Sequence, residues 1–289
     1  MTKLDESETR KIVWFFLIAY GFTWLFWISE ALAARGLLGS SILVDFLLGP
    51  RNPAAWGPFV GAILLTFWHQ RWKGVLRLLK KSVDYKFAKK WWIPTILLCP
   101  IIIGGALLIA ALAGESIPEL YWMSNPTLIL VNFVVILFTG GPLQEDFGWR
   151  GYALPRLQGW LTALVSIIIL GFMWGLWHLP YFFIGTELTY AYGIIPQVIT
   201  AILLSILLTW LFNNTGGSIL VSLTFPNMFN LSNDMFPALR TQLGSPLFIA
   251  FFITAAIIVV AIWGPKRLVH KPKKMLDSQG ITVQHLYPV

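Results

Sequence analysis

The stretch LTALVSIIILGFMWGLWHLP, residues 161–180, decides how the chain folds. Nearly all of its residues are apolar, and about 20 such residues form a helix long enough to cross the hydrocarbon core of a bilayer. Because the apolar residues are continuous rather than alternating, the stretch favours a membrane helix over a strand of a transmembrane barrel. It therefore predicts a transmembrane helix that carries one ionisable side chain, His178, near its end.

Similar apolar runs recur along the whole chain. The 289 residues are 57% hydrophobic and 12% charged, about half the charged share of a soluble domain. Fifteen Trp and 21 Phe add the aromatic excess that is typical of membrane interfaces. We predict an all-α, polytopic integral membrane protein that forms one membrane-embedded domain over residues 1–289. About eight spans are expected, at 13–34, 53–69, 92–113, 127–149, 161–183, 194–212, 217–233 and 246–264.

The basic residues predict how the chain is oriented. Segment 70–92 contains eight Lys or Arg residues and a single acid, and the tail at 265–289 adds five more basic residues. Short basic loops stay on the cytoplasmic side of a membrane and meet anionic lipid headgroups. We therefore place the N-terminus, segment 70–92, the turn at 150–160 and the tail at the cytoplasmic face of the cell membrane. The loops at 114–119 and 185–188, which hold acids and no Lys or Arg, fall on the opposite side.

This placement also accounts for the net charge of +8. The positive charge faces membrane lipid, which is the expected partner, and nucleic-acid binding is not predicted. The first span is too long for a removable signal peptide and is expected to remain as an anchor.

Few polar side chains lie inside the predicted spans. Ionisable groups are costly in lipid, so each one is a hypothesis for a functional site. The single cysteine, Cys99, excludes an intrachain disulfide and lies in an apolar run, where we interpret it as a packing residue. The remaining candidates are Glu145, Asp146, Arg150, His178, Asn227, Asn230 and Asn233.

The segment LQEDFGWRGY, residues 143–152, holds three charged residues between two apolar runs. Asp146 and Arg150 are four residues apart, so on a helix they share a face and are expected to form a salt bridge. Glu145 lies about 100° around the helix from Asp146 and is free to point elsewhere. Two interpretations stay open at this point. Either Arg150 holds Asp146 while Glu145 is free to take part in a reaction, or the ion pair only locks two helices together.

Helix lengths predict that three polar side chains meet. If the helix of Glu145 continues with a kink at Pro155 and turns at Gly159, then Glu145 and His178 lie roughly 21 and 28 Å from that turn. Asn230 lies roughly 20 Å beyond the next turn on the same side. The three groups can therefore converge in one layer of the membrane domain.

A carboxylate and an imidazole can together deprotonate a water molecule, and asparagine amides can stabilise a developing oxyanion. The same carboxylate and imidazole can instead bind zinc. The chain has no HExxH motif and only one histidine well inside a span, so we predict no cofactor and keep zinc as the lesser alternative. Buried Glu/His pairs also relay protons in transporters, but no paired broken helices of the transporter kind are evident.

These residues resemble those of the CPBP intramembrane proteases, the group of CAAX prenyl proteases and bacteriocin-processing enzymes also called Abi. EDFGWR at 145–150 resembles the first family motif, EExxxR, with Asp146 in place of the second Glu. WGLWH at 174–178 resembles the second motif, FxxxH, with Trp174 in place of Phe. GPFVGAI, beginning at Gly57, is also similar to the family. The resemblance covers most of the chain, and it implies a catalytic core at about 53–233.

The resemblance implies an intramembrane endopeptidase in which Glu145 and His178 activate the attacking water, with Asp146 and Arg150 in support. The third family motif, HxxxN, supplies the oxyanion donors. Aligned on GGSILVSLTFPNMFN, which ends at Asn230, its asparagine is Asn230 and its histidine position is Pro226. Proline has no side-chain donor and no N–H.

The next residue, Asn227, is a replacement candidate for the missing donor, although it lies about 100° around the helix from Pro226. Three functions stay open: a protease with a rearranged oxyanion hole, a weakened enzyme, and a non-catalytic relative that binds peptides in immunity or acts as a scaffold. Loss of one oxyanion donor lowers the rate by about 10²–10³ and does not abolish it. We therefore predict a protease acting on a peptide or protein substrate that is membrane-associated or lipid-modified.

Overall fold

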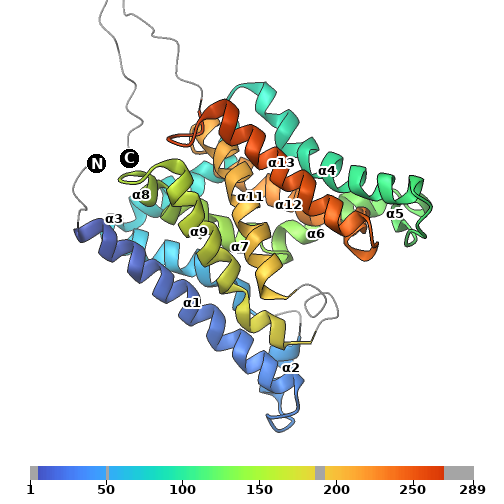
Figure 1. Cartoon of the computed structure of the whole chain (residues 1–289). Coiled ribbons are helices and arrows are strands. Elements are labelled where there is room, and N and C mark those ends of the chain that lie inside the picture. Colours follow the sequence, from blue (N-terminus) through green and yellow to red (C-terminus); the bar gives the residue numbers. More distant parts are fainter. Residues whose placement is uncertain (1–5, 50–51, 186–192, 270–289) are drawn as a thin grey trace, which may run out of the picture.

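The computed structural model describes residues 6–49, 52–185 and 193–269, and within these ranges the chain is helical and has no strand (Figure 1). The helices are α1 (Glu6–Ala34), α2 (Ile42–Leu48), α3 (Gly57–Lys80), α4 (Trp92–Leu112), α5 (Tyr121–Ser124), α6 (Thr127–Thr139), α7 (Pro142–Gly148), α8 (Leu154–Gln158), α9 (Ala163–Trp177), α11 (Ile194–Asn214), α12 (Ile219–Met235) and α13 (Gly244–Trp263). Short 3-10 turns η1 (Ala54–Trp56), η2 (Lys81–Val83), η3 (Lys89–Trp91), η5 (Leu179–Phe183) and η6 (Ala238–Arg240) connect them, and η4 (Trp149–Ala153) is a π turn. The all-α prediction is confirmed.

The number of spans differs from the eight predicted. In the described ranges five helices are long and apolar enough to cross a membrane, and α6 with the helical run 142–158 makes a sixth if that bent pair is one span. Helix α12 has 17 residues, fewer than the roughly 20 that a span needs. The second half of α3 is rich in basic residues and has a kink at Arg71, where φ is 55°. The predicted spans 53–69 and 217–233 thus correspond to real helices that lack the length or composition of a full span.

The outer faces of the longest helices are apolar. On α4 a row of exposed side chains recurs every four or seven residues, at Ile93, Leu97, Ile101, Leu108 and Leu112. Such a large apolar surface is rare on a soluble monomer, and it suits contact with lipid. The chain is therefore a multi-pass membrane protein.

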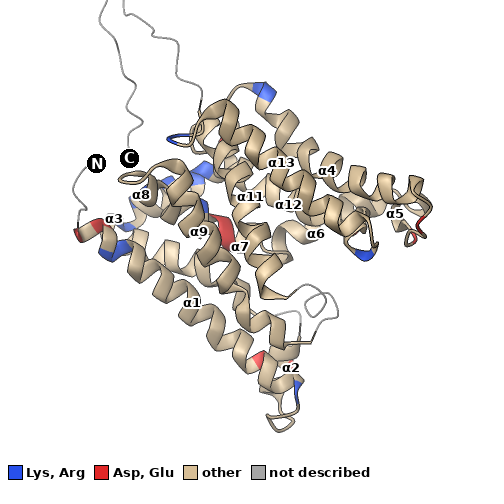
Figure 2. Cartoon of the chain, in the orientation of Figure 1, with Lys and Arg blue, Asp and Glu red and all other residues tan. Residues whose placement is uncertain are grey.

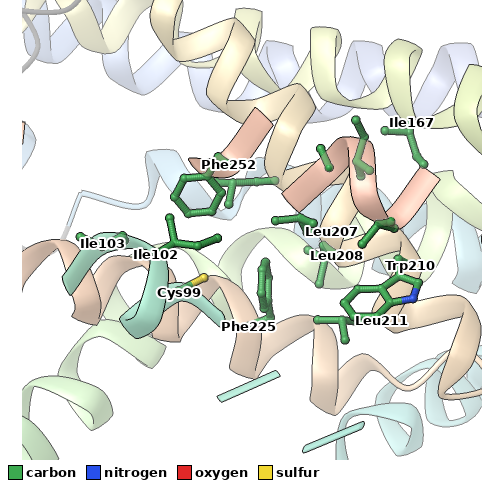
Figure 3. Packing of buried hydrophobic residues seen from close by; sticks show 14 of the residues in the cluster. Cys99, Ile102, Ile103, Ile167, Leu207, Leu208, Trp210, Leu211, Phe225 and Phe252 are labelled. Atoms are coloured by element: carbon green, nitrogen blue, oxygen red, sulfur yellow. The ribbon is translucent and has the colours of Figure 1, made fainter. Parts of the chain in front are cut away.

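Two apolar clusters hold the helices together. One joins α4, α11, α12 and α13, and Figure 3 shows Phe225 between Cys99 and the leucines of α11. Cys99 is completely buried and unbonded, which confirms its interpretation as a packing residue. The other joins α1, α3 and the helices from α7 to α9, where the Trp149 ring lies 5.4 Å from Phe15 and 5.8 Å from Trp177. The polar segment described below lies where helices of both clusters meet.

The backbones of helices α9 and α11 lie in close contact. A Cβ added at Gly171 would lie 2.7 Å from Ile202 Cα, and one at Gly175 would lie 2.6 Å from Val198 Cα. The two glycines have the spacing of a small-xxx-small contact, in which missing side chains let two backbones approach. The pairing of 171 with 202 and of 175 with 198 shows that the helices are antiparallel, and it sets their register.

The basic segments lie together at one end of the molecule (Figure 2). Arg156 Nε lies 3.5 Å from Glu8 Oε2, the backbone N–H of Ala163 donates to Lys266 O at 2.8 Å, and Ser218 Oγ donates to Asp84 O at 2.6 Å. The predicted grouping of the chain start, the basic segment, the turn at 150–160 and the beginning of the tail is therefore present.

The opposite end of the molecule carries both acidic and basic residues. Glu115 lies there and accepts from Leu243 N, but Arg35 and Arg240 follow helix ends on the same side. Most of the predicted loop at 185–188, and the tail from 270 onward, lie outside the described ranges.

Candidate active site

The charged segment begins at a break between two helices. Helix α6 ends at Thr139, α7 begins at Pro142, and the two axes differ by 45°. Gly141 between them has φ of 105°, a conformation that residues with a Cβ rarely adopt. A Cβ there would also overlap Glu145 Oε1. The glycine therefore lets the chain bend and leaves room for the carboxylate of Glu145.

This break corrects the prediction of a kink at Pro155. The helical run continues from α7 through the π turn into α8, and Pro155 lies in the first turn of α8. Proline is tolerated in the first turn of a helix, where its missing N–H has no partner to lose. The irregular geometry falls instead on Trp149–Ala153, and such π turns often occur at functional sites.

Glu145 is held in a fixed position by two tryptophans. The residue is only 8% exposed, and Trp174 Nε1 on α9 donates to Oε2 at 2.6 Å. Trp149 Nε1 lies 3.4 Å from the same oxygen. Hydrogen bonds to a charged acceptor are stronger than those between neutral groups. The indole of Trp174 thus ties α7 to α9 through the carboxylate.

Asp146 and Arg150 form the predicted salt bridge. Arg150 Nη1 lies 2.9 Å from Asp146 Oδ1, and both side chains are almost completely buried. Arg150 Nη2 also donates to Ser205 Oγ on α11 at 3.1 Å, and the guanidinium lies 4.4 Å from the Trp174 ring centroid. This pair therefore locks α7 to α9 and α11, and Glu145 is not part of it.

His178 is at the C-terminal cap of α9. Its Nδ1 lies 2.9 Å from the carbonyl oxygen of Trp174. A carbonyl only accepts, so Nδ1 carries a proton, and Nε2 of the neutral ring keeps its lone pair. The ring packs edge-on against Trp177 at 4.7 Å. The same tryptophan residue, Trp174, therefore fixes Glu145 through its side chain and His178 through its backbone.

Glu145 and His178 line one cavity of about 900 Å³. Asn230 on α12 and Trp174 on α9 line it as well, so the three polar groups expected in one layer do share a site. The rest of the wall is mainly apolar and includes Phe182, Phe229, Pro246, Phe248 and Ile249.

The third motif is only partly represented in the cavity. Pro226 lines the wall and offers no donor. Asn230 lines it too, and its Nδ2 donates to the carbonyl of Gly140, at the helix break, at 2.8 Å. Asn227 is fully buried, donates to Phe133 O on α6 at 3.0 Å, and is not among the cavity residues. The prediction that Asn227 replaces the missing donor therefore finds no support in the geometry.

Two residues of the site were not recognised from the sequence. Trp174 was noted as a departure from a family motif, but its N–H was not considered as a partner for Glu145. Gln197 on α11 also lines the cavity. The only signal for Gln197 in the sequence is that it is a polar residue between the apolar segments IIP and VIT. A neutral polar residue in an apolar run is a weaker indication of a functional site than a buried charge.

The described residues contain no group of three or more His, Cys, Asp or Glu side chains placed to hold a metal ion. The prediction of a site without a cofactor stays a prediction, and the chelation experiment below tests it.

Comparisons with known proteins agree with the sequence resemblance. Residues 126–232 match the family model described as Type II CAAX prenyl endopeptidase Rce1-like. A curated relative, the CAAX prenyl protease 2 of Methanococcus maripaludis, is 25% identical over 256 residues, which cover 85% of this chain and 92% of the relative. The family match spans Glu145, His178 and Asn230, three polar residues that line the cavity.

Proposed function

We propose that this chain is an intramembrane endopeptidase of the CPBP family and that it hydrolyses a peptide bond with a water molecule held between Glu145 and His178. The observation that carries the proposal is the double role of Trp174, which holds Glu145 by its indole N–H and His178 by its carbonyl, with both residues on one cavity wall. Fixing two catalytic groups relative to each other lowers the entropic part of a reaction barrier.

In the proposed reaction, the water donates one hydrogen bond to Nε2 of His178 and gives a proton to the Glu145 carboxylate. Its oxygen forms a bond to the peptide carbonyl carbon, and the carbonyl π electrons move onto the carbonyl oxygen. The C–N bond then breaks as the carbonyl re-forms, and Glu145 returns the proton to the departing amine. The products are a carboxylic acid and an amine, and both side chains end as they began.

Asp146 and Arg150 support this reaction without taking part in it. Their buried pair fixes α7 against α9 and α11, so that Glu145 faces the cavity while the neighbouring carboxylate faces the arginine. Arg150 also places a positive charge against the face of Trp174. A cation over an indole ring stabilises the arrangement of both groups.

Asn230 is the first donor for the developing oxyanion. One of its two amide N–H groups is used by Gly140, which leaves the other for a ligand in the cavity. Preorganised donors of this kind contribute the largest single part of many hydrolytic rate accelerations.

The substrate is proposed to be a membrane-associated peptide, either lipid-modified or apolar near the scissile bond. The mainly apolar cavity wall suits such a ligand, and the relative from Methanococcus maripaludis is named a CAAX prenyl protease. The basic end of the molecule is proposed to face the cytoplasm, where anionic lipid headgroups attract Lys and Arg.

A second candidate function is a catalytically impaired relative that binds peptides, as in immunity or as a scaffold. The observation in its favour is Pro226, which occupies the cavity wall where the resemblance expects a histidine donor. If wild type cleaves no peptide of a broad panel while Pro226→His creates cleavage, this candidate is correct.

The test of the protease is cleavage of a fluorogenic membrane peptide by the purified protein in proteoliposomes. Wild type should cleave, and Glu145→Gln should lose about 10²–10⁴ of the rate, the share that general base catalysis usually supplies. Glu30→Gln is a matched control, since Glu30 is a half-buried carboxylate that accepts from Asn52 Nδ2 at 2.8 Å and does not line the cavity. Activity that survives EDTA would agree with a site without a metal ion, and loss restored by zinc would contradict it.

A further inference from the structure

The proposed reaction lacks one donor. The resemblance implies two oxyanion donors from the third motif, but Pro226 has none and Asn227 is directed to a backbone carbonyl outside the cavity. Asn230 retains one free N–H. A single donor would leave the rate about 10²–10³ below that of a complete oxyanion hole.

Gln197 has the properties of the missing donor. It lines the same cavity as Glu145 and His178, on the neighbouring helix α11. Its side-chain amide has no hydrogen-bond partner among the residues that the structure describes. An amide nitrogen only donates, and both of its N–H groups are available for a ligand.

The register of α9 and α11 places Gln197 at the depth of the catalytic pair. Because residue 175 faces residue 198 and the helices are antiparallel, Gln197 lies opposite residue 176. That level is halfway between Trp174, which holds Glu145, and His178. The tight glycine contact at Gly175 fixes this level, since the helices cannot slide past each other without a backbone clash.

We propose that the side-chain amide of Gln197 donates a hydrogen bond to the carbonyl oxygen of the scissile peptide and to the oxyanion formed from it, in place of the donor that Pro226 lacks. The inference rests on the proposed hydrolysis. Gln197 and Asn230 then form a two-donor hole from α11 and α12, with the attacking water on the side of Glu145 and His178.

Three hydroxyl groups also line the cavity and serve as comparisons. Thr200 lies one turn further along α11 than Gln197 and opposite residue 173 of α9. Tyr181 lies in η5, after His178 in the chain, and Ser245 lies in the first turn of α13. By the register of α9 and α11, Thr200 lies outside the level between Trp174 and His178.

The experiment compares Gln197→Ala, Gln197→Glu and Thr200→Val in the proteoliposome assay. Gln197→Glu keeps the length of the side chain but replaces the donating nitrogen with an oxygen. Both Gln197 variants should lose about 10²–10³ in kcat with KM changed less than threefold, since the donor acts on charge that develops only in the transition state. Thr200→Val, which removes a hydroxyl from the same cavity wall, should lose less in kcat than either Gln197 variant. Thermal unfolding at the wild-type temperature excludes a folding defect.

A second readout uses a peptide phosphonate, whose tetrahedral anionic group has the geometry of the intermediate. Its affinity should fall by a factor similar to the loss in kcat in Gln197→Ala, while affinity for the parent peptide stays the same. Equal phosphonate affinity in wild type and Gln197→Ala, or a larger loss in Thr200→Val, would overturn the role of Gln197.

The two claims fail in different ways. If wild type cleaves and Gln197→Ala cleaves equally well, the proposed hydrolysis stands and this inference is wrong. If Glu145→Gln cleaves like wild type, the proposed mechanism is wrong, and phosphonate affinity still decides whether Gln197 binds an oxyanion.

Discussion

Replacing Gly141 with alanine tests whether the position of Glu145 controls the rate of catalysis, independently of the stability of the protein. Gly141 has φ of 105°, and a side chain there costs roughly 1–2 kcal/mol because its Cβ approaches the neighbouring carbonyl. The new Cβ would also overlap Glu145 Oε1, so the carboxylate has to move by about 1 Å to regain ordinary contact. A displacement of about 1 Å in a catalytic group can cost about 10²-fold in rate. Gly141→Ala should therefore lose about 10²-fold in kcat.

Gly114→Ala is the matched control for this prediction. Gly114 has φ of 88°, so it carries a similar backbone cost, but a Cβ there meets nothing within 4 Å. Both variants should lose a similar amount of stability in urea unfolding followed by tryptophan fluorescence, and only Gly141→Ala should lose activity in the peptide assay. If both variants cleave at the same rate, the position of Glu145 beside the helix break does not control catalysis, and the reasoning is refuted.

Three further predictions concern the contacts around Glu145. Trp174→Phe keeps an aromatic ring but removes the N–H that donates to Glu145, and a hydrogen bond to a charged group is worth about 1.5–3 kcal/mol. We expect kcat to fall at least about tenfold. The control Trp122→Phe loses a hydrogen bond to Met235 O and should not change kcat. Asp146→Asn leaves Arg150 without its charged partner and should lower the free energy of unfolding by about 3–5 kcal/mol. Glu8→Gln, at the partly exposed pair with Arg156, should lower it by about 0–1 kcal/mol. Equal losses in the two variants would show that the buried ion pair does not hold the helices together. Gly175→Ala should separate α9 from α11 and lower both stability and kcat, and unchanged values of both would argue against the close crossing.

Much of the site follows from simple periodicity. The four-residue spacing of Asp146 and Arg150 predicted their salt bridge, and the 1.5 Å rise per helical residue predicted that Glu145, His178 and Asn230 lie at similar depth. These inferences hold because a segment in a membrane forms its backbone hydrogen bonds within its own helix, so the number of residues along the sequence gives the distance along the helix axis.

Other features depend on tertiary contacts that periodicity does not contain. The bend falls at Gly141 rather than Pro155, since a positive φ stops a helix while a proline in the first turn does not. The direction of an asparagine amide depends on which backbone carbonyl lies within reach: Asn227 donates to Phe133 O on α6, and Asn230 donates to Gly140 O beside the cavity. The count of eight spans is not confirmed, because α12 has only 17 residues and α3 ends in the basic segment.

The central claim is that Glu145 performs the chemistry in the cavity. The most direct measurement is the rate of cleavage of one membrane peptide by wild type and by Glu145→Gln, each reconstituted at equal amount and shown to be folded by its unfolding temperature. The account predicts cleavage by wild type and a loss of about 10²–10⁴ in the variant, with Glu30→Gln unaffected. Cleavage by Glu145→Gln at the wild-type rate would contradict it.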